Sequence, residues 1–272
     1  MAQIILVTSF KGGVGKTTIS ANLAICLALA GQKVLVCDCD LESRCLDIVL
    51  GIENQPLFNI CDVVTGKCPS SNAICADDRF ENLYFMPAPA FYPEAVQTQD
   101  TSEMFSEQAV RSFISSVSSE YDYIIFDLPA RPDMLYRRLV RHADRVFVIS
   151  LHTAASIRAA EKTAIAINEL CAGTAVPDTK LIINSFKAAD VKKGENSGIY
   201  EIITKTKLPL GGVIPYDEEM VNAQESGVIA AVYKNGKLPF WKAISNIAKR
   251  IEGKNIELLD GIKTGVKKSE LY

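Results

Sequence analysis

Short apolar runs alternate along the chain with longer segments in which apolar residues recur at helical spacing. The runs lie at residues 3–8, 34–37, 82–87, 123–126, 145–149, 181–183 and 212–214. The helical segments lie at residues 19–30, 57–64, 103–118 and 154–171. Continuous apolar strands that alternate with helices are typical of a parallel sheet covered on both faces. The pattern therefore predicts an α/β fold in which a doubly wound, mostly parallel sheet is flanked by helices.

Polar residues and a proline stand at the ends of several of these runs. Asp38, Asp127 and Asn184 each follow a predicted strand directly, and Pro215 follows the last one. Ligands of open parallel sheets bind beyond the carboxyl ends of the strands. We therefore expect a ligand site where these residues meet. The segment 187–198 is rich in lysine and glycine, and we expect it to be a mobile surface loop.

The first predicted strand is joined to the first helix by a loop with the sequence KGGVGKTT. Glycines in such a turn let backbone N–H groups point toward a bound anion, and the helix N-terminus adds partial positive charge. Lys16 can reach the β- and γ-phosphates, and the Thr17 hydroxyl can ligate Mg²⁺. The loop residues expected to bind a nucleotide are Gly12, Gly13, Val14, Gly15, Lys16, Thr17 and Thr18.

The loop departs from the strict P-loop pattern at one position. That pattern has glycine six residues before the lysine, where this chain has Phe10. The chemically active half, Gly15-Lys16-Thr17, is intact. A glycine-rich turn that binds nothing is the alternative, and the strand-loop-helix context argues against it.

Length, charge and cysteine content narrow the class of protein. The chain has 272 residues, and we expect one domain over residues 1–252 with a tail over residues 253–272. The net charge of −3 gives no electrostatic basis for binding nucleic acid. The eight cysteines form no Cys-x-x-Cys pair and no signal peptide precedes them, so we expect reduced thiols in a cytoplasmic protein rather than a metal or iron–sulfur site. The apolar helix 19–30 is too short to span a bilayer.

The sequence KGGVGKTT is a deviant Walker A motif and resembles that of the MinD/ParA ATPases. The resemblance covers about residues 1–232, and the N-terminal half is most similar to the MinD branch. It implies a P-loop NTPase fold of the deviant Walker A type that binds ATP and Mg²⁺, forms an ATP-dependent homodimer and hydrolyses ATP slowly under stimulation by a partner. In this family the first lysine of the motif, here Lys11, crosses the dimer interface to the other subunit's phosphates. A solvated surface lysine is the alternative for Lys11.

Two strand ends resemble the family's switch segments. Asp127 has the position of a Walker B acid, which holds Mg²⁺ through a water, and helix capping is its alternative role. In the family's first switch the second aspartate, here Asp40, orients the attacking water, while Asp38 supports Mg²⁺ or the switch; alternatively both acids cap the next element. Glu42 and Arg131 stand where the family usually has glycine. The resemblance thus implies Lys11, Lys16 and Asp40 as catalytic residues and Thr17, Asp38 and Asp127 as metal-binding residues.

Asn184 and Pro215 are candidates for contact with the base. An asparagine amide can both donate to and accept from an adenine edge, and a proline suits a loop that lies flat on a base. In MinD-like proteins these two positions flank adenine. The absence of an Asn-Lys-x-Asp sequence, which would read guanine, favours ATP over GTP. An ordinary turn role stays open for Asn184.

The resemblance weakens at the surfaces that bind partners. Ser156-Ile157-Arg158 matches the start of the family helix that binds activator and inhibitor proteins, but Ala159 replaces an acid there. Thr153 replaces a glutamate that contacts the other subunit's nucleotide. We therefore expect an activator or cargo protein whose identity the sequence does not give.

The tail has a weak amphipathic pattern. Its apolar and basic positions would share one side of a helix: Ile256, Leu259, Ile262, Lys263, Val266 and Lys267. Gly261 and Gly265 weaken such a helix, and no Trp or Phe anchors it. A packed or frayed end is favoured over a helix that holds the protein at the inner face of the cell membrane.

Several functions fit these features. The first is a MinD-like ATPase switch that controls placement of a division or polar structure. The second is an adaptor that holds nucleotide with little hydrolysis, which Glu42 and Arg131 favour. The third is a ParA-like partitioning ATPase, which the near-neutral charge disfavours. Electron transfer of the nitrogenase iron-protein type needs cluster cysteines in two loops, and the loop after Asp127 has none.

Overall fold

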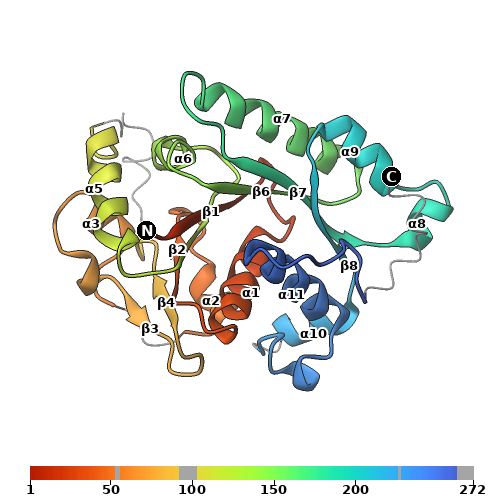
Figure 1. Cartoon of the computed structure of the whole chain (residues 1–272), viewed down its shortest axis with the longest axis horizontal. Helices are drawn as coiled ribbons and strands as arrows, with labels where there is room; N and C mark the ends of the chain where they lie inside the picture. The colour runs from red at the N-terminus through yellow and green to blue at the C-terminus, as the bar shows by residue number, and fades with distance from the viewer. Residues whose placement is uncertain (53–55, 92–102, 226–227, 262–272) are drawn as a thin grey trace.

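One eight-stranded sheet runs through the molecule in the order β3-β4-β2-β5-β1-β6-β7-β8 (Figure 1). The computed structural model describes residues 1–52, 56–91, 103–225 and 228–261. The strands are β1 (Gln3–Thr8), β2 (Val34–Asp38), β3 (Cys75–Ala76), β4 (Leu83–Met86), β5 (Tyr123–Asp127), β6 (Arg145–Ser150), β7 (Asp178–Phe186) and β8 (Leu210–Pro215). Neighbouring strands are parallel except for β3 and β4. The predicted mostly parallel α/β sheet is confirmed.

Helices cover both faces of this sheet (Figure 1). On one face lie α3 (Ile60–Val64), α5 (Glu107–Ser118), α6 (Met134–Val140), α7 (Ala154–Leu170) and α9 (Ile199–Thr206). On the other lie α1 (Lys16–Leu29), α2 (Leu46–Leu50), α10 (Glu218–Glu225) and α11 (Pro239–Ile251). Short elements complete the description: α8 (Ala188–Lys192), η1 (Ser70–Asn72) and η2 (Tyr233–Gly236).

Alternation along the strands supplies two separate apolar cores. In β1, Ile4 and Leu6 belong to the core beneath α5, α6 and α7, whereas Ile5 and Val7 belong to the core beneath α1 and α11. Successive side chains of a strand point to opposite faces, so a strand buried on both sides is apolar at every position. This explains why the sequence shows continuous apolar runs rather than alternation.

The sheet brings the predicted functional residues to one edge. β1 lies between β5 and β6, and β2 lies on the other side of β5. In register, Val7 is opposite Asp127, and Asp127 is opposite Asp38. The loop after β1 and the acids that end β2 and β5 are therefore neighbours.

The segment predicted as a mobile surface loop, residues 187–198, contains the helix α8, so that prediction is wrong for Ala188–Lys192. Two contacts fasten the segment to the end of β6. Nε2 of the buried His152 lies 3.4 Å from the Asp190 carboxylate, and the Ser197 N–H donates to the His152 carbonyl oxygen over 3.1 Å. These contacts are tertiary and have no local sequence signal.

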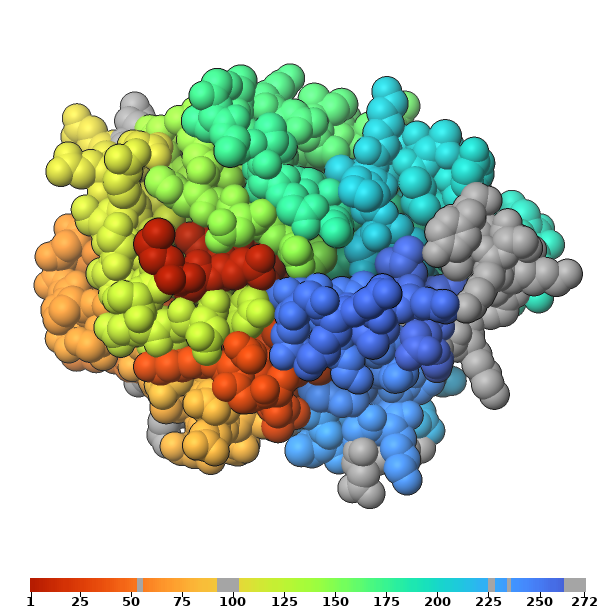
Figure 2. Space-filling model, viewed as in Figure 1, coloured from red at the N-terminus to blue at the C-terminus, as the bar shows by residue number. Residues whose placement is uncertain are grey.

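The chain after α11 turns back along that helix. The Asn246 amide donates to the Asp260 carbonyl oxygen over 2.6 Å, and residues 258–261 form turns rather than a helix. The predicted positions Ile262, Lys263, Val266 and Lys267 lie outside the described residues. In the space-filling view the blue part of the chain, which contains α11, lies against the red N-terminal residues and against the orange-red part that follows them (Figure 2). The helices α1 and α11 are in contact. Across the described ranges, no helix combines the length and the apolar character needed to cross a bilayer.

Candidate nucleotide-binding site

The loop between β1 and α1 has the backbone of a phosphate-binding loop. Gly13 and Gly15 have φ angles of 71° and 92°, in the left-handed region that favours glycine. From β7, the Asn184 amide donates to the Val14 carbonyl oxygen over 2.8 Å. A Cβ on residue 15 would collide with that amide. The loop is thus held from β7 in a conformation that only glycine accommodates at position 15.

The N-terminus of α1 is open toward this loop. The helix begins at Lys16, and no described side chain caps its first turn. Lys16 is buried, and the Ser9 hydroxyl is buried without a hydrogen-bond partner among the described residues. Free N–H groups at a helix start, an ammonium group and an unpaired hydroxyl all suit an anion. The donor set therefore fits the phosphates of a nucleotide.

Asp127 ends β5 beneath the start of α1. Its side chain is 1 % exposed, and its Oδ1 accepts a hydrogen bond from the Ser20 hydroxyl over 2.9 Å. Burial raises the pKa of Asp127 to about 6, although the Thr17 and Ser20 hydroxyls and the Lys16 charge favour its ionised form. Ser20 was not predicted, but its place four residues after Lys16 puts it on the same face of the helix. Asp127 is placed to accept from water or hydroxyls around a cation near Thr17.

Asp38 organises the chain that follows β2. It is fully buried, and its two oxygens accept from the N–H groups of Asp40 and Leu46 over 2.9 and 3.0 Å. Burial, together with the Asp127 charge, raises the pKa of Asp38 to about 7. Asp40 accepts from the Ser43 N–H over 3.0 Å. Asp38 thus holds the start of α2, as the capping alternative expected, whereas Asp40 holds the turn before it, and further lone pairs stay available on each carboxylate.

A fourth carboxyl group joins this cluster. Asp133 caps α6 by accepting from the Tyr136 N–H over 2.7 Å, and burial is the largest cause that raises its pKa, to about 6. The Asp40 charge also raises the pKa of Asp133 and of Asp127. An aspartate before a helical run is a capping signal, so Asp133 could have been predicted.

The acids do not form a metal cage by themselves. Within the described ranges no three His, Cys, Asp or Glu side chains are gathered closely enough to hold a metal ion. This agrees with the chemistry of Mg²⁺ at phosphate sites, where a few protein ligands act together with phosphate oxygens and water. The donors present, a threonine hydroxyl above buried carboxylates, fit Mg²⁺ in that manner.

Lys11 lies at the outer side of the loop. It is half-buried, and no described carboxylate forms an ion pair with it. The preceding Phe10 is held by Thr163 of α7, whose hydroxyl accepts from the Phe10 N–H over 3.1 Å. Because this contact joins residues far apart in the chain, no local pattern predicts it. Among the described residues of its own chain, no acid thus holds the Lys11 ammonium group, which is free to contact a phosphate.

The base end of the site lies at β7 and β8. Asn184 is buried and already donates one amide hydrogen to Val14, which leaves its second hydrogen and its oxygen for other partners. Pro215 is buried at the end of β8. Beyond it, the Lys187 ammonium group lies 3.7 Å from the centre of the Tyr216 ring, a contact that was not predicted.

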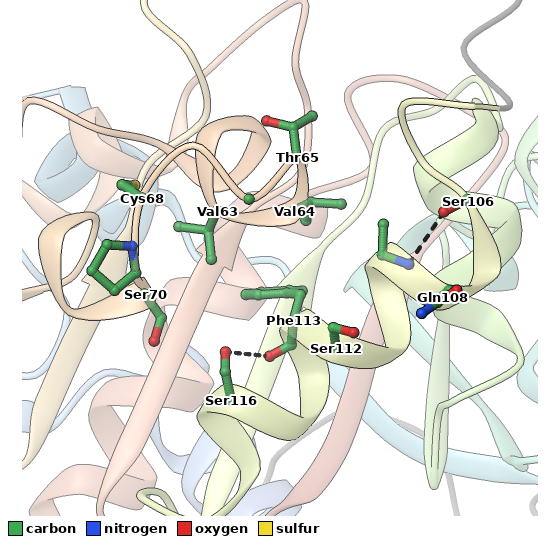
Figure 3. Close-up of a pocket in the computed structure, with 13 residues that line it drawn as sticks. Val63, Val64, Thr65, Cys68, Ser70, Ser106, Gln108, Ser112, Phe113 and Ser116 are labelled. Atoms are coloured by element: carbon green, nitrogen blue, oxygen red, sulfur yellow. Dashed lines mark hydrogen bonds between the residues drawn. The ribbon is translucent and has the colours of Figure 1, made fainter.

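Two of the hollows in the described ranges lie among the helices on the α5–α7 face of the sheet. One, of about 850 Å³, borders the loop at Phe10 and runs between α7 and the end of α9. The other, of about 510 Å³, lies between α3 and α5 (Figure 3). Several of its hydroxyls serve their own helix, as Ser116 donates to the Phe113 carbonyl oxygen and Ser106 accepts from the Ala109 N–H. The second hollow contains none of the predicted site residues.

Comparisons with known proteins agree with this geometry. The family model described as an AAA domain matches residues 2–172. The septum site-determining protein MinD of Bacillus subtilis is 33 % identical over 259 residues, which cover 95 % of this chain and 92 % of that protein.

Solved structures give the same result. The MinC:MinD cell division protein complex of Aquifex aeolicus superimposes with a TM-score of 0.78 at 31 % identity, covering 94 % of this chain and 98 % of the matched chain. MinD of Pyrococcus horikoshii, solved with Mg-ADP, has a TM-score of 0.75 at 25 % identity, covering 93 % and 96 %. With matches along nearly the whole chain, the protein belongs to the MinD/ParA family of ATPases, whose cofactors are ATP and Mg²⁺.

Proposed function

We propose that this protein binds Mg-ATP in the β1–α1 loop, dimerises around two nucleotides and hydrolyses ATP slowly under stimulation by a partner. Its output is the placement of a division or polar structure. The observation that carries the proposal is the open start of α1, with buried Lys16, above buried Asp127. The groups that would bind phosphates and the buried acid that would support a cation thereby lie together at the start of α1.

The proposed roles follow from the position of each residue. The N–H groups of residues 12–18 and the Lys16 ammonium group bind the phosphates. Thr17 ligates Mg²⁺, which neutralises charge on the phosphates, while Asp127 and Asp38 support it. Asp40 orients the attacking water, and it need not be a strong base because phosphoryl transfer mainly requires positioning.

The remaining contacts are with the base and with the second subunit. Asn184 and Pro215 flank adenine, and Lys11 reaches the nucleotide of the other subunit. We further propose that residues 1–252 act as one ATPase domain in the cytoplasm. A relative from Aquifex aeolicus forms a complex with MinC. By analogy we propose that this chain also acts through a partner protein, an activator or cargo that reads its nucleotide state; membrane attachment through the tail is the less favoured proposal.

One specific observation favours a second function, an adaptor that retains nucleotide with little hydrolysis. Asp38 fastens both Asp40 and Leu46 through backbone N–H groups, so the first switch is closely held in the described conformation. Glu42 and Arg131 add side chains on the exposed surface of the two switches. A switch that moves little would hydrolyse ATP slowly even when a partner is bound.

Two measurements test these proposals. Calorimetric titration should show ATP binding that Lys16→Ala abolishes, because several charge-assisted contacts to phosphate are lost together. Unchanged ATP affinity in that variant would contradict the assignment of the loop. Steady-state phosphate release then separates the two functions, since the adaptor would bind ATP with no measurable turnover.

A further inference from the structure

Thr163 joins the phosphate-binding loop to α7 through a hydrogen bond in which its hydroxyl oxygen is the acceptor. Its hydroxyl is buried and donates to the Ala159 carbonyl oxygen one turn earlier, over 2.8 Å. Because a hydroxyl has a single hydrogen, its oxygen faces Phe10 only as an acceptor, and it receives the Phe10 N–H over 3.1 Å. Phe10, at the start of the phosphate-binding loop, is thus held to α7.

Tyr136 of α6 holds the same stretch of chain from a second side. The Thr8 hydroxyl donates to the Tyr136 oxygen over 3.2 Å, and the two ring centroids of Phe10 and Tyr136 are 6.0 Å apart. Tyr136 is fully buried, so its ring has little freedom to move. Residues 8–10 are therefore clamped between the helices that follow β5 and β6.

The other half of the loop has a different anchor. Asn184 of β7 holds Val14 and fills the space beside Gly15. We call residues 8–10, together with Thr163 and Tyr136 that hold them, the clamp. Lys11 directly follows the clamp and precedes Val14, which Asn184 holds. A small displacement of the clamp would redirect Lys11, while Gly15, Lys16 and Thr17 would stay fixed by β7 and α1.

We propose that Thr163 and Phe10 are positioning residues that aim Lys11 across the subunit interface. The proposal rests on the ATP-dependent dimer of the proposed function. It adds that the placement of α6 and α7 sets the strength of that dimer through Phe10, whereas phosphate binding within one subunit is independent of them. The two helices begin beyond Asp127 and the end of β6, so changes at the switch segments reach Lys11 by this route.

The test compares Thr163→Val with Thr163→Ser. Valine keeps the shape of threonine but cannot accept the Phe10 N–H, whereas serine keeps the hydroxyl. Valine should leave ATP affinity within about twofold of the parent and weaken ATP-dependent association about tenfold, the effect of one unmade buried hydrogen bond. Serine should restore association, as measured by sedimentation with Mg-ATP.

A second variant tests the contact with Tyr136 on the other side of the clamp. It also keeps the proposal testable if Thr163→Val does not fold. Phe10→Ala removes the ring that contacts Tyr136 and leaves the backbone N–H in place, and Phe10→Leu is its conservative control. We expect Phe10→Ala to behave as Thr163→Val, with normal ATP affinity and weak association. Parental association in either folded variant, checked by its thermal midpoint, would overturn the positioning role.

The outcomes also separate this inference from the function on which it rests. A parental protein that binds ATP and stays monomeric would overturn both the dimer and the clamp. A parental protein that binds no ATP would overturn the proposed function as a whole. If the parent dimerises and the valine and alanine variants dimerise equally well, only the positioning role fails.

Discussion

The Asn184 side chain occupies the space into which a Cβ on residue 15 would project. Its amide also donates to the neighbouring Val14 carbonyl oxygen over 2.8 Å, and Gly15 has a φ of 92°. A side chain at position 15 is therefore excluded twice, by the left-handed backbone and by the contact with β7. The phosphate-binding loop and the base end of the site share this one contact.

Gly15→Ala should destabilise the protein and weaken ATP binding. A left-handed backbone costs a non-glycine residue about 1–2 kcal/mol, and displacing Asn184 adds to that cost. Gly12→Ala is the matched control, because its φ is outside the left-handed region and an added Cβ meets nothing within 4 Å. Urea unfolding should show a loss of stability for the first variant alone. Equal stability of the two variants would mean that the Asn184 side chain can move away from residue 15 without lowering the free energy of unfolding.

Lys11→Ala should bind ATP and stay monomeric. A lysine that serves only its own site would, when lost, lower the affinity of the monomer, whereas a lysine that acts across a two-fold interface affects both sites of the dimer at once. Light scattering with Mg-ATP should show no dimer, and hydrolysis should be lost with it. Lys192→Ala, at an exposed position on α8, is the control and should dimerise as the parent does. A normal dimer of the Lys11 variant would reject the role in trans.

Asp40→Ala should bind Mg-ATP, stop hydrolysis and accumulate as the ATP-bound dimer, because the attacking water loses the group that orients it. Asp40→Asn separates this role from structure, since its oxygen can still accept from the Ser43 N–H. Both variants should fall at least about tenfold in phosphate release, with unchanged nucleotide affinity. Turnover at the parental rate in either one would assign water positioning to another residue.

The free protein should lose stability as the pH rises. Burial raises the pKa of Asp38 to about 7 and the pKa of Asp127 to about 6, both above the value of about 4 in an unfolded chain. Between these values the folded protein binds more protons than the unfolded chain, so raising the pH favours unfolding. We expect Tm to fall on the order of 5 °C from pH 5 to pH 8.

Asp127→Asn tests the source of this slope. The variant removes one of the buried carboxyl groups that titrate in this range, a set that also contains Asp133, and it keeps an oxygen that can accept from Ser20. Scanning calorimetry should show a shallower fall of Tm in the variant than in the parent. A Tm that rises over this pH range in the parent would contradict the buried, protonated state of these acids.

Apart from β3, the strands were predicted well because each contains positions buried on both faces and has a continuous apolar signal. β3 escaped prediction because two residues have no period. α11 was missed although its signal was present, with Pro239 at the first helical position and apolar residues on one face at helical spacing. α2 and α8 are too short for periodicity to reveal them.

The residues of the site could likewise be predicted only where the signal is local in the sequence. The loop and the strand-end acids are local patterns, so their positions could be read directly. The hydrogen bond between Phe10 and Thr163 and the contact between Asn184 and Val14 join residues more than 150 positions apart. Such contacts depend on which strands become neighbours, and periodicity does not contain that information.

The two apolar cores have a consequence for how this protein tolerates deletions. In a strand with one wet face, removing a residue exposes apolar side chains and buries polar ones. In β5 every interior position is apolar, so a chain shortened by one residue among 124–126 would still present apolar side chains to both cores. Asp127 would instead be drawn back from the loop by about 3.3 Å, one strand step. Because successive side chains of a strand point to opposite faces, the same deletion would turn Asp127 away from Ser20 and toward the core beneath α5 and α6. The cost of the deletion would therefore fall on this one acid, in stability as well as in nucleotide binding, and not on the apolar positions.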